Sequence, residues 1–288
     1  MSESTIWRGV FLLLATAFNS PVRAQEIEAG NRITVLVKPS LTRVSAYTVQ
    51  YAYQLANLAE SKQKVWQFYV LTRVPGSHLA NIRSTKHWGA GVPERDSTAS
   101  VRWGTATDND IAPGESRDGF SFESPSPPGI VDYYAEGYHK LPGFREGMAP
   151  DSIPGYDDLT PYGPGIVGKT VGPVLPPEPF VPMTFLDTLV SYKHQAAALG
   201  WVGQEGFLRQ LDEKLDQSRD QLTKGHIKQA RDKVEEFLKK LENEAKKTEK
   251  DQDKKNDKKW VTSEGYALLK FNAEYLIEKL DEQITKKK

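Results

Sequence analysis

The spacing of apolar residues changes midway along this chain, and that change constrains the fold more than any other feature. Up to about residue 138 apolar side chains recur at every second position, whereas from residue 184 they recur at every third or fourth. The first spacing lines one face of a strand, and the second lines one stripe of a helix. A chain of 288 residues is long enough to hold each pattern in a domain of its own.

The amino-terminal pattern predicts about six strands between residues 33 and 138. The segment AYTVQYAYQL shows it best, because Val49, Tyr51, Tyr53 and Leu55 alternate with polar or small residues. The other segments are ITVLV, KVWQFYVL, SVRWG, DGFSFES and GIVDYYAEGY. Turn-forming residues such as Gly, Pro, Asn, Asp and Ser separate them. Short strands punctuated in this way predict an antiparallel β-sandwich over residues 25–140.

Residues 141–183 lack either spacing and are dense in proline and glycine. Proline fixes the backbone and removes a hydrogen-bond donor, while glycine loosens the chain. This composition predicts an extended linker. A change of spacing across such a linker also predicts two halves that are structurally independent.

Four amphipathic segments follow the linker, so residues 184–288 are predicted to form a four-helix bundle. The second and third segments are separated by Lys224, Gly225 and His226. Glycine after the last apolar residue of a helix favours a left-handed ending, and a lysine beside it suits the negative end of the helix dipole. We therefore interpret this interruption as a hairpin turn between two helices, with His226 exposed, and not as a ligand site.

The fold class is thus α+β and multidomain, an antiparallel β-sandwich followed by a four-helix bundle. The runs LRQLDEKLDQSRDQLTKGHIKQARDKVEEFLKKLENE and TSEGYALLKFNAEYLIEKL resemble the FIMAH module, a small helical domain of secreted bacterial proteins. That resemblance implies an extracellular appendage with no catalytic residues to carry over. In the first half, IAPGESRDGFSFES resembles a strand pair of bacterial immunoglobulin-like and fibronectin-like surface domains.

The first 24 residues have the order of a signal peptide. Arg8 precedes the apolar run GVFLLLATAF, and Val22 and Ala24 supply the small residues required at a cleavage site. We expect cleavage near Ala24 and a secreted or periplasmic mature protein. Ten apolar residues are too few for a membrane helix, which needs about 20, and no second apolar run predicts a transmembrane segment in the mature chain.

The amino-acid composition excludes several kinds of site and partner. The chain has no cysteine, which excludes disulfides and thiolate sites. Its 38 basic and 38 acidic residues cancel, which disfavours a nucleic-acid partner. Neither a GxSxG nor an HExxH motif occurs, so we predict no catalytic residues, no metal site and no cofactor. The expected function is non-enzymatic binding or structural support in the bacterial envelope or extracellular space. The alternative is an accessory or degenerate glycan- or peptide-active hydrolase, with a carboxylate pair such as Asp132 and Glu136.

Aromatic residues supply the candidate ligand-binding positions. Trp88 lies in the loop-like segment HWGAGV, and Tyr133, Tyr134 and Tyr138 lie close together. Exposed rings on a sandwich stack on sugar or peptide faces, whereas inward rings fill the core, and the sequence leaves both readings open. The partners considered are a glycan, a peptide or a cell-wall polymer, and self-association is left open.

Overall fold

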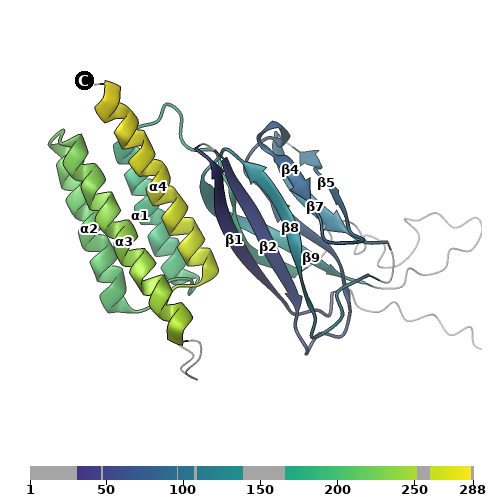
Figure 1. Cartoon of the computed structure of the whole chain (residues 1–288). Coiled ribbons are helices and arrows are strands. Elements are labelled where there is room, and N and C mark those ends of the chain that lie inside the picture. Colours follow the sequence, from purple (N-terminus) through teal and green to yellow (C-terminus); the bar gives the residue numbers. More distant parts are fainter. Residues whose placement is uncertain are drawn as a thin grey trace, which may run out of the picture.

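A computed structural model describes residues 31–46, 48–95, 97–106, 109–138, 166–251 and 260–286. It contains a β-sandwich and a bundle of helices that lie side by side (Figure 1). The predicted signal peptide, with its cleavage site near Ala24, and most of the predicted linker lie outside the described residues.

Two antiparallel sheets build the sandwich, as predicted. One has the strand order β1-β2-β8-β4 and the other the order β10-β9-β3-β7-β5, with β6 paired to β7. The strands of the first sheet are β1 (Val35–Ser45), β2 (Thr48–Asn57), β8 (Ser116–Ser124) and β4 (Ala80–Arg83). Those of the second are β10 (Ile166–Pro173), β9 (Pro128–Gly137), β3 (Val65–Leu71), β7 (Thr98–Gly104), β5 (Gly89–Gly91) and β6 (Glu94–Arg95). A 3₁₀ turn, η1 (Gly76–His78), precedes β4.

Aromatic side chains fill the space between the two sheets. The rings of Phe68 and Trp103 stack with centroids 5.4 Å apart, and the ring of Tyr53 packs beside them. The Tyr53 hydroxyl donates a 2.8 Å hydrogen bond to the Val171 carbonyl in the opposite sheet. These rings therefore provide apolar burial and also a polar link between the layers.

The prediction of a linker throughout residues 141–183 is wrong in its second half. Residues 166–173 form β10, which pairs with β9 at the edge of the second sheet. Gly168 explains why the strand was missed, because a side chain there would overlap the Tyr133 ring, whose atoms lie within 2.4 Å of an added Cβ. The sheet requires glycine at this position, and glycine conceals the alternation that marks a strand.

The four predicted helices form the bundle. They are α1 (Pro182–Ala198), α2 (Glu205–Thr223), α3 (Ile227–Asp251) and α4 (Ser263–Lys286). Their apolar stripes meet in one core that includes Leu211, Leu215, Phe237, Leu269 and Leu276.

The turn between α2 and α3 is a hairpin, as predicted. Gly225 has a left-handed backbone with φ of +74°, and its amide donates to the Leu222 carbonyl over 3.0 Å. His226 is exposed and its ring lies 3.2 Å from the Gln221 side-chain oxygen. The interruption is thus a helix ending of the kind that glycine favours.

The expectation that the two halves are independent is wrong. Helix α4 packs against β1, β9 and β10, and so covers the side of the sandwich where the edge strands of both sheets meet (Figure 1). Phe271 of α4 is buried in the sandwich core, while Ile130 and Val171 of the sandwich belong to the bundle core. The buried Asn272 amide donates to the Pro128 carbonyl over 2.7 Å. One helix therefore completes two cores.

Candidate functional site

A groove runs along α4, between β1 on one side and α3 on the other. It consists of two hollows of about 900 and 870 Å³, both lined by Leu41 and Phe271, where they meet. We call these two hollows together the α4 groove. Because β1 belongs to the sandwich and α3 to the bundle, the groove exists only when the two parts are docked.

The first hollow follows the carboxyl-terminal half of α4. Its apolar lining consists of Leu41, Leu238, Phe271 and Ile277. Charged side chains surround this lining, namely Arg43, Glu235, Lys270, Glu274, Glu278, Asp281, Glu282 and Lys286. An apolar floor with a charged rim suits an amphipathic ligand.

Two cations of the rim connect the walls of the groove. Arg43 of β1 lies 3.6 Å from a Glu274 carboxylate oxygen and 3.5 Å from one of Glu278. Lys270 of α4 lies 3.7 Å from both Glu242 of α3 and Glu274. Burial disfavours the charge on Lys270, but Glu274 and other groups beside it outweigh burial and raise its pKa above the ordinary lysine value. Both cations are therefore already occupied by carboxylates of the protein.

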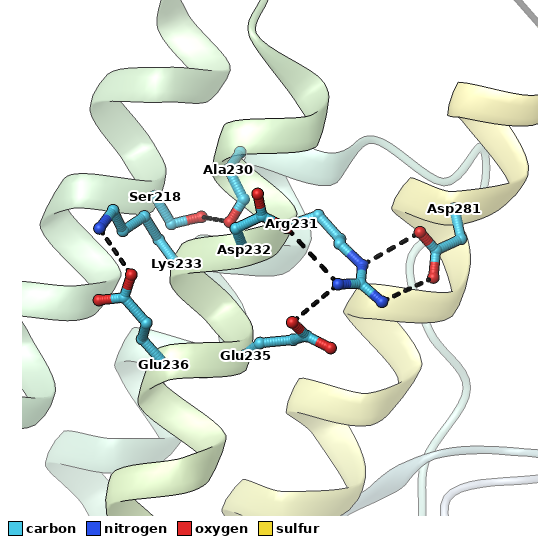
Figure 2. Close-up of polar contacts among 8 residues, drawn as sticks. All are labelled: Ser218, Ala230, Arg231, Asp232, Lys233, Glu235, Glu236 and Asp281. Carbon is cyan, nitrogen blue, oxygen red and sulfur yellow. Dashed lines mark hydrogen bonds and ion pairs between the residues drawn. The ribbon is translucent and has the colours of Figure 1, made fainter.

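Arg231 of α3 organises the carboxylates behind this rim (Figure 2). Its Nε lies 3.1 Å from an Asp281 oxygen, and its Nη1 lies 2.8 Å from Glu235 and 3.5 Å from Asp232. Figure 2 shows the guanidinium between α3 and α4, with the Asp281 carboxylate facing it from α4. Three carboxylates thus share the positive charge of one arginine.

The second hollow lies beside the amino-terminal end of α4. Aromatic residues Trp201, Tyr266 and Phe271 contribute to its lining, as do the hydroxyl residues Ser40, Thr262 and Ser263. Leu36 of β1 and Leu199 of the turn after α1 also line it and remain exposed. Exposed large apolar side chains around one hollow are a mark of an interaction surface.

Trp88, predicted as a surface ring, is a core residue. Only 5% of it is exposed, its ring packs 5.1 Å from that of Phe120, and its Nε1 donates to the Asn109 carbonyl over 3.0 Å. The physical reason is that its amide bonds to the Thr85 carbonyl in a tight turn, which precedes β5 and directs the ring inward. The loop-like composition of HWGAGV did not reveal this turn.

The three candidate tyrosines do not form one patch. Tyr133 is buried against Phe68 and lies over Gly168. Tyr134 is half-buried, and it lies on the opposite face of the sheet because neighbouring strand residues alternate. Tyr138 is 49% exposed. A solitary exposed tyrosine does not make the aromatic platform that the four candidates implied.

The carboxylate pair of the hydrolase alternative is poorly placed. Asp132 and Glu136 lie four residues apart in β9, which separates them by about 13 Å along the strand. Glycoside hydrolysis needs carboxyl groups roughly 5 to 10 Å apart. Asp132 is also engaged, since Lys169 of β10 lies 2.5 Å from its carboxylate. These two residues therefore do not support glycosidase chemistry.

Two short matches to catalytic motifs escaped the sequence analysis. The run GPGIVGKT at 163–170 has the spacing of a phosphate-binding loop, but Gly168, Lys169 and Thr170 lie inside β10. Such a loop must lead into a helix whose amino terminus holds the phosphate. The run SKQK at 61–64 has the SxxK spacing. Its Ser61 hydroxyl accepts from the Thr34 amide and donates to the Thr34 carbonyl, so it serves the backbone.

Glu136 is the buried carboxyl with the most altered acidity among the residues described. It lies beside Gln67 of β3 in the second sheet. Burial raises the pKa of its carboxyl to about 7, an effect that the nearby Arg102 guanidinium partly offsets. A buried acid of this kind disfavours its own ionised form.

We expect Glu136→Gln to flatten the pH dependence of stability. Between pH 4.5 and 7 the unfolded chain releases a proton that the folded chain keeps. The unfolding free energy should therefore fall in this window, by about 2 kcal/mol, because one pKa unit corresponds to about 1.4 kcal/mol and partial solvation reduces the effect. Urea titrations of both proteins at several pH values measure the difference. An unchanged slope in the variant would show that Glu136 ionises normally.

Among the described residues, no helix is long and apolar enough to cross a membrane. Within the same ranges, no group of three or more histidine, aspartate or glutamate side chains is arranged to hold a metal ion.

One known domain family matches part of this chain. Residues 186–278 match the FIMAH domain, which confirms the resemblance found in the helical half. Among solved structures, an uncharacterized protein of Nocardia farcinica described as having an immunoglobulin-like fold is 14% identical, covers 49% of this chain and 98% of its own, and has a TM-score of 0.29. A CBM3 structure of Hungateiclostridium clariflavum is 11% identical, covers 32% of this chain and 72% of its own, with a TM-score of 0.24. No curated protein matches the sequence.

Proposed function

We propose that this chain is an exported, non-enzymatic binding protein whose binding site is the α4 groove. The observation that supports this proposal is a pair of hollows that share Leu41 and Phe271 in their lining and are built jointly by the sandwich and the bundle. Their volumes lie within the range of roughly 300 to 1,000 Å³ typical of ligand pockets. Export rests on the order of residues 1–24 and on what the FIMAH resemblance implies.

The floor favours a segment of a partner protein over a glycan. In the first hollow it is mainly aliphatic, with Leu41, Leu238 and Ile277 half-buried. Sugars are usually held by exposed aromatic faces, but the aromatic residue that lines this hollow, Phe271, is buried. An amphipathic polypeptide segment buries one apolar row on such a floor and leaves its polar side at the rim.

Changing the floor tests the proposal. Peptides selected from a random display library on the purified mature chain should bind Ile277→Gln at least about tenfold more weakly, a change of about 1.4 kcal/mol. Val167→Gln on β10 is the control, because Val167 is a β-branched apolar residue that solvent reaches and that lies outside the residues lining the groove. It should leave binding unchanged.

Two outcomes would contradict the proposed binding site. Selected peptides that bind the two variants equally well would place the binding surface elsewhere, and a library that yields no binder would remove the site. Mass spectrometry of the exported protein tests the other part, since the mature chain should begin at Gln25. An intact Met1 terminus would contradict export.

A further inference from the structure

We infer that the segment bound in the α4 groove is basic, with lysine or arginine residues flanking its apolar row. This inference rests on the proposed function and specifies the partner of the same site. It follows from the distribution of charge around the first hollow, which is uneven although the chain as a whole has no net charge.

Carboxylates outnumber cations on the rim of the first hollow. The acidic residues are Glu235, Glu274, Glu278, Asp281 and Glu282, and the basic ones are Arg43, Lys270 and Lys286. The ion-pair partners of these residues behind the rim do not correct the imbalance. They add Asp232 and Glu242 on the acidic side and Arg231 and Lys279 on the basic side. Among the residues that the structure describes, seven carboxylates therefore face five cations.

Two of the surplus carboxylates on the rim of the first hollow are exposed to solvent. The Asp281 carboxylate shares Arg231 with two other carboxylates and has a side chain that is 50% exposed. Glu282, the next residue of α4, is 36% exposed and lies 2.8 Å from Lys279 of the same helix. Arg43 and Lys270 are each held between two carboxylates of the protein, so neither is available to attract an acidic ligand. A basic flank placed over this rim would meet more carboxylates than cations.

Solvent reaches these carboxylates, which determines how large the effect should be. Pairs of exposed charges gain little energy each and are screened by salt, so their joint effect on affinity should be about tenfold and salt-sensitive. The apolar floor supplies the remainder of the affinity and does not depend on salt in this way. The charge of the rim thus distinguishes between amphipathic segments that would bind the apolar floor equally well.

Three peptides that differ only in their flanks provide the test. Each is about 16 residues long, roughly 24 Å as a helix, and carries the same row of leucine and isoleucine with lysine, glutamine or glutamate flanks. Fluorescence anisotropy with the mature chain measures each affinity. We expect the lysine peptide to bind about tenfold tighter than the glutamine peptide, and the glutamate peptide to bind most weakly. Raising the salt until the Debye length falls from about 8 Å to about 3 Å should remove most of this preference.

A pair of charge variants assigns the preference to the rim. Asp281→Asn combined with Glu282→Gln should reduce it several-fold. The matched control is Glu213→Gln combined with Asp216→Asn on α2, which changes the net charge equally at exposed carboxylates that do not line the groove. The control should retain the full preference.

The outcomes separate this inference from the proposed function. If the lysine and glutamine peptides bind equally well and both are weakened by Ile277→Gln, the groove binds peptides and the charge inference is wrong. Equal loss of the preference in both charge variants would also overturn it, because the attraction would then come from overall charge. If no peptide binds, or Ile277→Gln has no effect on any of them, the proposed function itself fails.

Discussion

Replacing Phe271 by alanine should lower the free energy of unfolding by about 3 to 5 kcal/mol, the usual cost of removing a buried phenylalanine. Phe271 lies on a helix of the bundle, yet its ring is buried in the sandwich core. Its removal leaves a cavity at the point where the two parts meet. Both parts should therefore lose stability together, although only the helix carries the change.

Two spectroscopic probes of one urea titration measure this effect. Circular dichroism at the helical minimum follows the bundle. Tryptophan fluorescence follows the sandwich, whose core holds Trp103, when it is recorded in a background in which the bundle residues Trp201 and Trp260 are replaced by phenylalanine. We expect both midpoints to move to lower denaturant by the same amount. Phe237→Ala, which removes a ring from the bundle core alone, is the control for a cavity of similar size. A Phe271→Ala protein whose two midpoints separate, or whose stability falls by less than about 1 kcal/mol, would show that the parts are not coupled through this residue.

Gly265→Ala should destabilise the protein by about 3 kcal/mol, although the same change within a helix normally stabilises it by up to about 1 kcal/mol. Gly265 lies in the first turn of α4, where an added Cβ would be 2.4 Å from the Trp201 carbonyl oxygen and 2.9 Å from a Val202 methyl group. The carbonyl belongs to the backbone of the turn between α1 and α2, so it cannot rotate aside. The start of α4 would have to move away.

Gly206→Ala is the matched control for this change. Gly206 lies in the first turn of α2, and an added Cβ there would have no atom within 4 Å. Thermal unfolding should show a higher melting temperature for Gly206→Ala and a lower one for Gly265→Ala. If both variants gain stability, the close approach of α4 to the turn before α2 does not exist in solution.

The elements of the fold were largely predictable from local patterns. Tyr51 and Tyr53 marked β2 because strand residues alternate between two environments, and both are buried. Gly225 marked the end of α2 because its left-handed backbone favours glycine. Such signals depend on a few neighbouring residues, so they can be read without knowing the rest of the structure.

The docking of the two halves and the groove that it creates were not predicted, because they depend on contacts between distant segments. A signal for them was nevertheless present in α4. Leu269, Ala273 and Leu276 account for one apolar stripe, but Leu268 and Phe271 lie off that stripe and are buried too. A helix that is apolar on more than one face must be covered on more than one side. This second face indicated a partner for α4 outside the bundle.

Trp88 shows the limit of composition as a guide. A tryptophan among glycines suggested a surface loop, but the Ser84 hydroxyl donates to the Trp88 carbonyl and the Thr85 carbonyl accepts from its amide. These bonds direct the ring toward Phe120. The direction of a side chain in a short turn is set by such bonds, which residue type alone does not reveal.

The shared helix also imposes an order of events on biosynthesis. The last strand of the sandwich ends at Pro173, whereas α4 begins only at Ser263. A ribosome that adds about 5 to 20 residues each second would need roughly 5 to 18 seconds to make the intervening chain. Until α4 arrives, the edge strands β1 and β10 and the site that Phe271 fills are uncovered, and open strand edges pair readily with other chains. We therefore expect the sandwich to remain open along these two edges until its closing helix has been made.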